Sequence, residues 1–245
     1  MPTTLDAVLL DSADPAALGA WWAGLLGWSH VLDHEGDARL DPPDGAPGLR
    51  IDVLHDPDPA AGTHRLHLDL RSGSASEQAE LVARAERAGA RRIDVGQGDV
   101  PWVVLADPEG TRFCVLEPRE DYAGTGALAA VVVQALDPAR LAAFWAEATG
   151  RPVTASGPDF ASLAAPDGAG PALEFVTVPH LPAGKNRVHL DVRPEPGGDR
   201  HAEVTRLLAL GAVPLEIGQS ADPACTASWT VLADPEGGAF CVLNP

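Results

Sequence analysis

The chain has 245 residues, an ordinary hydrophobic content of 45% and a formal net charge of −18 at pH 7. This charge would repel a phosphate backbone or an anionic lipid surface, so we expect no nucleic-acid partner and no membrane partner. The sequence has no apolar run long enough to span a bilayer and no basic N-terminal stretch followed by an apolar one, so we expect a cytoplasmic protein. The acidity has two interpretations: it keeps the protein soluble, or it attracts a cationic or metal-bearing ligand.

The first 90 residues predict a strand and two helices, with further short strands between the helices. Residues 5–10 form a short apolar run that is typical of a buried strand. A helix is predicted to begin at Asp14-Pro15, because Asp caps helices and Pro suits the first helical position, and to end at Gly27. A second helix begins after Ser74, which opens a capping box, and ends at Gly89.

One hairpin motif occurs twice in the chain. Residues 102–118 and 229–245 share the pattern Trp-x-Val-Leu-Ala-Asp-Pro-Glu-Gly-x-x-Phe-Cys-Val-Leu-x-Pro. In its Asp-Pro-Glu-Gly segment, Pro presets the backbone of a turn and Gly tolerates a positive φ, so each copy predicts two strands joined by a tight turn. We expect the turn carboxylates, Asp107 and Glu109 in the first copy, to be solvated.

The rest of the order also repeats, which indicates an internal duplication. Residues 1–120 and 127–245 each read as two β-α-β-β-β modules, and the polar segment 121–126 is the predicted linker between these two domains. An insertion within 219–228 accounts for the one change of spacing between the copies and predicts a loop.

Several features of this duplicated unit are those of a known superfamily. They are the strands at 65–70 and 187–192 with a His-Leu-Asp core, the Gly-Ala pairs that close helices, and Ala-Asp-Pro-Glu-Gly followed by Phe-Cys-Val-Leu. Together they resemble the vicinal oxygen chelate superfamily, in particular tandem glyoxalase-like domains of the glyoxalase, bleomycin resistance and dioxygenase type. The resemblance implies an α+β fold, in which paired modules form a curved sheet around a cavity and the helices lie outside.

The two His-bearing strands alternate between apolar and polar residues. In 65–70 this period of two turns the leucines to one face and Arg65, His67 and Asp69 to the other, which looks into the hollow of the sheet. Such a histidine could act as a general base beside its carboxylate, or the pair could be a buried, hydrogen-bonded feature that organises the sheet. The candidate catalytic residues are His67, Asp69, His189 and Asp191.

The resemblance also implies a divalent metal, held by the His-bearing strand, the final strand and the other end of the module. The final-strand position falls on Cys114 and Cys241, and the first-strand position falls near Ala7 and Ala130. The fourth strand offers Glu174 in the second domain and Arg50 in the first. We therefore expect the first domain not to hold a hard metal, whereas the second could hold Mn, Fe, Ni or Zn through His189 and Glu174.

The cysteines and the hairpin tryptophans each have two interpretations. Cys114 and Cys241 occupy equivalent positions and Cys225 lies apart, so a disulfide framework is not expected. The equivalent pair could fill space as small apolar residues or act as nucleophiles beside a histidine. Trp102 and Trp229 could stack on a planar ligand or pack between sheet and helix. The candidate ligand-binding residues are Trp102, Cys114, Glu174, Trp229 and Cys241.

Two functions of different kind follow from these features. The first is a binding module that sequesters or carries a small organic molecule, which needs a cavity and no metal. The second is an enzyme of lyase, isomerase or dioxygenase type, which works through a divalent metal or uses His67 or His189 without one. A small-molecule ligand is the expected partner in both cases, and the organisation is also compatible with a homodimer.

Overall fold

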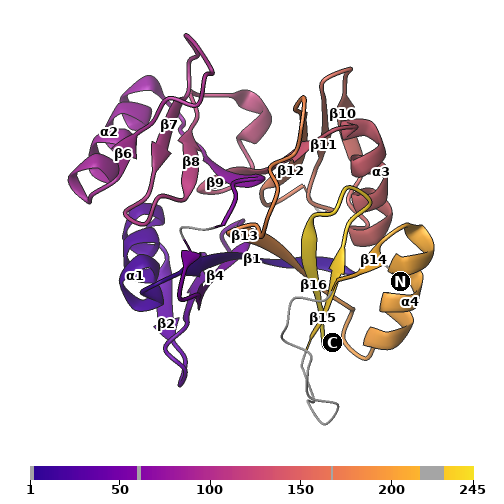
Figure 1. The fold of residues 1–245 in the computed structure, drawn as a ribbon. Coiled ribbons are helices and arrows are strands. Elements are labelled where there is room, and N and C mark those ends of the chain that lie inside the picture. The colour runs from indigo at the N-terminus through magenta and orange to yellow at the C-terminus, as the bar shows by residue number, and fades with distance from the viewer. Residues whose placement is uncertain (1–2, 60–61, 167, 216–228) are drawn as a thin grey trace.

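The computed structural model describes residues 3–59, 62–166, 168–215 and 229–245, which form four α-helices, one 3-10 helix and sixteen strands (Figure 1). The first half contains β1 (Thr4–Ser12), α1 (Pro15–Leu26), β2 (Ser29–Leu32), β3 (Ala38–Asp41), β4 (Arg50–His55), β5 (Leu66–Leu70), α2 (Ala75–Arg87), β6 (Arg91–Arg92), β7 (Val103–Ala106), β8 (Arg112–Val115) and the 3-10 helix η2 (Glu120–Tyr122). The second half contains β9 (Leu128–Ala135), α3 (Pro138–Thr149), β10 (Val153–Ser156), β11 (Phe160–Leu163), β12 (Ala172–Thr177), β13 (Val188–Arg193), α4 (Arg200–Leu210), β14 (Val213–Pro214), β15 (Trp229–Ala233) and β16 (Ala239–Leu243).

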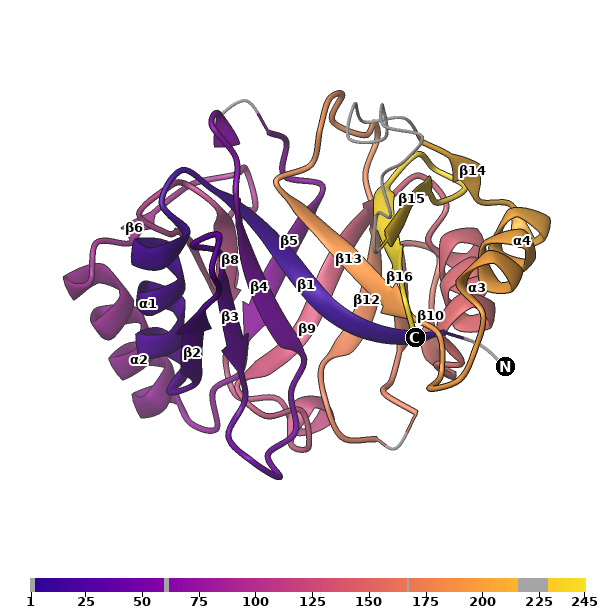
Figure 2. The ribbon, with the colours of Figure 1, turned by 90° about the horizontal axis from the view of Figure 1, so that it is seen from below.

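The strands form two eight-stranded sheets, and each sheet takes four strands from each half of the chain. The first sheet has the order β14-β15-β16-β13-β1-β4-β3-β2, and the second has the order β10-β11-β12-β9-β5-β8-β7-β6. The halves meet where β1 pairs antiparallel with β13 and where β5 pairs antiparallel with β9 (Figure 2). The expected α+β fold with curved sheets is confirmed. The linker 121–126 separates the sequence repeats and not the sheets, so each sheet belongs to both halves.

Capping groups confirm the predicted starts of both helices and the end of α1, whereas α2 ends at Arg87, two residues before the predicted Gly89. The Asp14 carboxylate accepts a hydrogen bond from the amide of Ala17 at 3.0 Å, and Gly27 ends α1 with a φ of +71°. The Ser74 hydroxyl accepts one from the amide of Glu77 at 3.1 Å at the start of α2. These contacts satisfy amides that lack a partner within the first turn of a helix.

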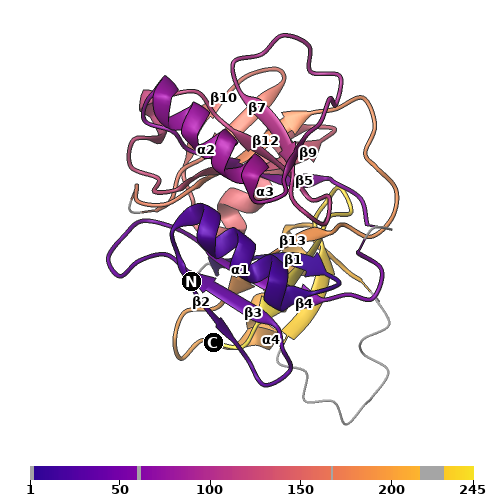
Figure 3. The same ribbon diagram turned by 90° about the vertical axis from the view of Figure 1, so that its left-hand side faces the viewer.

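One apolar core lies between the two sheets, with a pair of helices at each end. Helices α1 and α2 lie side by side at one end (Figure 3), and α3 contacts α4 at the other. Trp22 of α1 packs edge-on against Phe113 of β8, and Trp145 of α3 does the same with Phe240 of β16, both at 5.1 Å between ring centroids. Both sheets contribute leucines and valines to the same core, including Leu68 from the predicted alternating strand.

Both carboxylates of the first Asp-Pro-Glu-Gly turn are engaged in hydrogen bonds within the protein, so the expectation that they are solvated is wrong. Asp107 is fully buried and accepts hydrogen bonds from the amides of Glu109 and Thr111 and from the indole of Trp22. Glu109 accepts hydrogen bonds from the Ser12 hydroxyl at 2.8 Å and from two amides just before α1. Asp107 is therefore held by amides of its own turn and by the Trp22 indole, and the half-buried Glu109 is held by donors just before α1.

The second turn does the same in the other half, and a buried arginine crosses between the halves at each turn. Glu236 accepts hydrogen bonds from the amides of Leu136 and Asp137, both at 2.8 Å. Arg65 donates to the carbonyl of Glu236 at 3.2 Å, and Arg187 donates to the carbonyl of Glu109 at 2.9 Å. Each turn therefore caps a helix of its own half and holds an arginine of the other half.

Cys225 and the predicted loop insertion within 219–228 lie outside the described residues. Within the described ranges, no helix is long and apolar enough to cross a membrane.

Removing the Glu109 carboxylate should weaken the fold through the start of α1. We expect Glu109→Ala to lower the free energy of unfolding by roughly 1–3 kcal/mol, because the donors before α1 lose a charged acceptor. Urea denaturation followed by circular dichroism measures the change. The matched control is Glu195→Ala, since Glu195 is exposed and lies in a loop. Equal stability of the two variants would contradict the capping role.

Candidate functional site

Each sheet carries a pocket on the face that points away from the core. The pocket on the second sheet, which we call the β5/β9 pocket, has a volume of about 380 Å³. The pocket on the first sheet, the β1/β13 pocket, has a volume of about 530 Å³. Both are lined by side chains from both halves of the chain, because each lies across a junction where the halves pair.

In the β5/β9 pocket, a histidine, an aspartate and a cysteine lie close together. Alternation along β5 sends its leucines into the core and turns His67 and Asp69 toward the pocket. Strand β8 runs parallel to β5 with Cys114 opposite Asp69. The His67 Nε2 atom lies 3.2 Å from Asp69 Oδ1, and one ligand atom from each of the three residues lies within 4.8 Å of the others.

The β1/β13 pocket repeats this cluster with His189, Asp191 and Cys241. Asp191 of β13 is opposite Cys241 of β16, and the three ligand atoms again lie within 4.8 Å of one another. The predicted pocket-facing orientation is thus confirmed for both His-Asp pairs. It is wrong for Arg65 and Arg187, which are buried and reach the turns of the opposite half.

The structure corrects the expected position of the fourth-strand carboxylates. In the second sheet, Val132 of β9 pairs with His67 on one side and with Glu174 of β12 on the other. In the first sheet, Leu9 of β1 pairs in the same way with His189 and with Asp52 of β4. The counterpart of Glu174 is therefore Asp52 and not Arg50, so each pocket contains one such carboxylate.

The expected metal pair, His189 with Glu174, is not brought together. Glu174 lies on the second sheet and lines the β5/β9 pocket, whereas His189 lies on the first sheet and lines the β1/β13 pocket. The pairing is wrong because the strands pair across the two halves, and local sequence does not reveal which modules meet in one sheet.

Burial shapes the proton affinities at both clusters. Burial, with the charges of Asp52 and Asp6, raises the pKa of Asp191 to about 7. Desolvation of the imidazole lowers the pKa of His189 to about 4, so this side chain is neutral and a weak base at pH 7. Burial also raises the pKa of the Cys114 and Cys241 thiols. Protonated thiols are poor nucleophiles, which disfavours the nucleophile interpretation.

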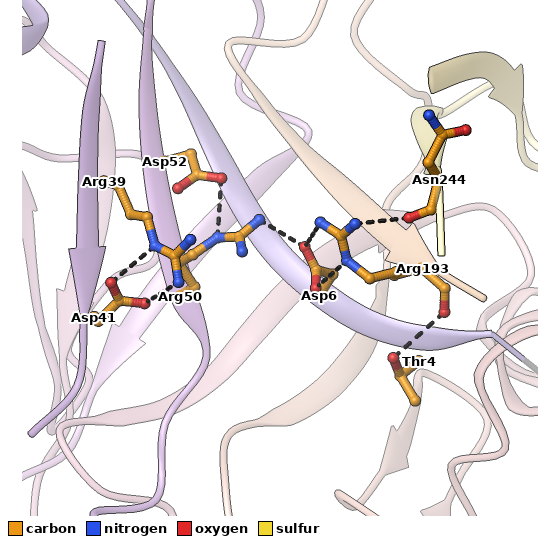
Figure 4. A network of polar contacts seen from close by, with 8 residues as sticks. All are labelled: Thr4, Asp6, Arg39, Asp41, Arg50, Asp52, Arg193 and Asn244. Atoms are coloured by element: carbon orange, nitrogen blue, oxygen red, sulfur yellow. Dashed lines mark hydrogen bonds and ion pairs between the residues drawn. The ribbon is translucent and has the colours of Figure 1, made fainter. Parts of the chain in front are cut away.

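A chain of ion pairs neutralises the arginine of the β1/β13 pocket (Figure 4). Arg50 of β4 lies 3.0 Å from Asp52 and 2.6 Å from Asp6 of β1, and Asp6 in turn lies 2.9 Å from Arg193 of β13. Lys185 is paired with Asp11 and Asp56. Both cations of this pocket are therefore matched by carboxylates. Among the described residues, five aspartates line the pocket: Asp11, Asp37, Asp52, Asp56 and Asp191.

The two hairpin tryptophans line the pockets, one in each. Trp102 lines the β5/β9 pocket, where the Arg119 guanidinium lies 5.6 Å from the centre of its ring. Trp229 lines the β1/β13 pocket and is 37% exposed. The interpretation of these residues as buried between sheet and helix is not what the structure shows.

The sequence did not single out three charged or titratable residues that line the β5/β9 pocket, nor the buried Tyr122 that contacts one of its carboxylates. Arg112 precedes Cys114 by two residues in one strand, so the period of two could have placed it on the same face. Tyr122 donates a hydrogen bond to Glu174 at 2.8 Å from a 3-10 helix in the predicted linker, which no local pattern indicates. The remaining pocket residues of this kind are His64 and Arg119.

The two His-Asp-Cys clusters could each hold a divalent ion. Imidazole nitrogen, carboxylate oxygen and thiolate sulfur suit zinc, and three protein ligands leave a coordination position open, as in catalytic zinc sites. Asp69 Oδ1 and Asp191 Oδ1 are buried and accept no hydrogen bond, so each offers a free lone pair. The donor set therefore fits a borderline-soft ion if the thiol loses its proton.

Stability should depend on pH through Asp191. The folded-state pKa of about 7 exceeds the ordinary value of 3.8, so the folded state holds this proton more tightly than the unfolded state does. The stability gained from this proton is complete at low pH and is lost as pH rises through 7. We expect the difference in the free energy of unfolding between Asp191→Asn and the wild type to shift in favour of the variant when the pH is raised from 5 to 8.5.

Urea denaturation at the two pH values measures this difference, and the exposed Asp58→Asn variant is the control. A stability difference for Asp191→Asn that is the same at both pH values would contradict the buried, protonated carboxyl group.

Comparison with known proteins gives a match to one family and a similarity of fold to several solved structures. The model of the glyoxalase-like domain family matches twice, over residues 7–116 and over residues 130–243. No curated protein sequence matches the chain.

Among solved structures, glyoxalase I from Zea mays aligns with a TM-score of 0.66 at 15% identity, over 99% of this chain and 92% of that one. A putative dioxygenase from Bacillus subtilis subsp. subtilis str. 168 aligns with a TM-score of 0.62 at 15% identity, over 99% of this chain and 86% of that one. At this level of identity the similarity is one of fold.

Proposed function

Because the chain belongs to the family of glyoxalase-like domain proteins, we propose that it binds small organic molecules in the β5/β9 and β1/β13 pockets. The observation that carries this proposal is the repeated composition of the pockets. Each has an apolar wall, one indole and a few converging polar side chains. Small-molecule sites typically have this composition and volumes of roughly 300–1,000 Å³.

The charge of the β1/β13 pocket favours a cationic ligand. Even with Asp191 protonated, the other four aspartates of its described lining outnumber Arg50 and Lys185, and those two cations already form ion pairs within the protein. A ligand ammonium group would find carboxylates there without displacing an arginine. The net charge of −18 adds a long-range attraction of the same sign.

Substitution of one tryptophan at a time tests binding in each pocket separately. Binding of planar aromatic amines and aromatic acids can be followed by calorimetry with the full chain. We expect Trp102→Ala to lower the affinity of ligands for the β5/β9 pocket by roughly 5–30-fold, because stacking on the indole is lost. Trp229→Ala is the matched control, since it occupies the equivalent position in the other pocket. The proposal fails if no compound in the set binds, or if neither substitution changes any affinity.

The second candidate function is metal-assisted catalysis of lyase, isomerase or dioxygenase type. The observation in its favour is that the His-Asp-Cys cluster occurs in both pockets with its ligand atoms within 4.8 Å. A bound divalent ion would polarise a substrate oxygen as a Lewis acid. His67, Asp69 and Cys114 would hold it in one pocket, and Tyr122 would keep Glu174 oriented beside them through its hydrogen bond.

Calorimetric titration with Zn²⁺, Mn²⁺, Fe²⁺ and Ni²⁺ tests this second function. If it is correct, Zn²⁺ binds with two ions per chain and releases protons, because the thiols must ionise. The pair of substitutions His67→Ala and His189→Ala should remove both sites. The absence of stoichiometric binding by any of the four ions would contradict the metal-assisted function and would leave the binding function unaffected.

A further inference from the structure

The β5/β9 pocket contains a guanidinium group that has no anionic partner. Arg112 begins β8 and lines the pocket two residues before Cys114. In the described part of the chain, its side chain forms neither an ion pair nor a hydrogen bond. Arg119, the other arginine of this pocket, lies 2.6 Å from Glu117. A partly buried cation without a partner is costly, and a bound anion would remove that cost.

A second unsatisfied polar group lies in the same pocket. His64, from the loop before β5, lines it, and its Nδ1 atom is buried without a hydrogen-bond partner. Desolvation and the positive charges of Arg112 and Arg187 lower the pKa of His64 to about 4, so its ring is neutral at pH 7. A neutral imidazole can still donate one hydrogen bond, and the positive field that keeps it neutral would attract an anion.

The rest of the pocket suits the body of an organic acid. Its walls include Val104, Val132 and Val176, with the Trp102 ring beside them. The carboxylates of Asp69 and Glu174 also line it, so the pocket has charges of both signs. An acid can therefore be oriented, with its anionic group on the arginine and its apolar part against the indole and the valines.

We propose that Arg112, assisted by His64, is the carboxylate-binding subsite of the β5/β9 pocket, and that this pocket takes small aromatic or apolar monocarboxylic acids. The guanidinium fork matches the two oxygens of a carboxylate. This inference rests on the proposed binding function and adds the ligand class for one of the two pockets.

The other pocket lacks this subsite. Ala239 stands at the position of Arg112 in the second hairpin copy, and Asn186 stands at the position of His64. The β1/β13 pocket is instead lined by five aspartates. The two pockets of one chain would therefore separate acids from cations.

Ligand-observed NMR and calorimetry with the full chain test this inference. The probes are benzoate and phenylacetate, their neutral amides and phenyl phosphate. We expect one acid per chain, at least tenfold weaker binding of each amide, and no advantage for phenyl phosphate over benzoate. Arg112→Gln should weaken the binding of the acids at least tenfold and leave the binding of the amides unchanged. Its thermal stability should equal or exceed that of the wild type, because no internal ion pair is lost.

The matched control is Arg92→Gln, which removes the same charge from an exposed strand. Arg112→Lys should recover part of the acid affinity. Amides that bind as well as acids, or acids that bind Arg112→Gln as tightly as the wild type, would overturn the subsite while preserving binding in the pocket. Tighter binding of phenyl phosphate would overturn the assignment of a carboxylate. If neither acids nor amides bind, both the subsite and the binding function of this pocket fail.

Discussion

Two antiparallel strand pairs, β1 with β13 and β5 with β9, join the halves of the chain, and both pockets depend on them. Each module alone is a four-stranded piece of sheet with one apolar face and an open edge. Pairing across the halves closes these edges at the centre of each sheet and brings two modules around one hollow. A shared core and the crossing arginines Arg65 and Arg187 hold the sheets together, so the pockets are properties of the whole chain.

Duplication of the module has produced two pockets with the same framework and different charge. The His-Asp-Cys cluster, the indole and the fourth-strand carboxylate recur in both. The copies differ at other positions: Ala239 replaces Arg112, and Asn186 replaces His64. The shared cluster is compatible with metal binding, and the residues that differ are the basis of our proposal that the two pockets take ligands of different charge.

Local patterns predicted much of the fold, and long-range register decided the rest. Caps, turn residues and the period of two predicted α1, α2, the hairpins and the pocket-facing histidines. They could not show which modules share a sheet, so His189 was matched with Glu174 although the two lie in different pockets. They also could not separate Arg50 from Asp52, because residues two apart on a strand share a face and only the pairing register distinguishes them. The burial of Asp107 was missed because the helix that covers it, with the Trp22 indole that donates to it, comes from another module.

The most direct test of this account is methyl NMR of the full chain, with valine and leucine methyls labelled and benzoate added. We expect shifts of Val104 and Leu116 in the first half together with Val132 and Val176 in the second, since all four line the β5/β9 pocket. Methyls of the β1/β13 pocket, such as those of Leu9 and Leu243, should stay unchanged. Shifts confined to one half of the chain, or centred on the β1/β13 pocket, would contradict a pair of distinct pockets shared between the halves.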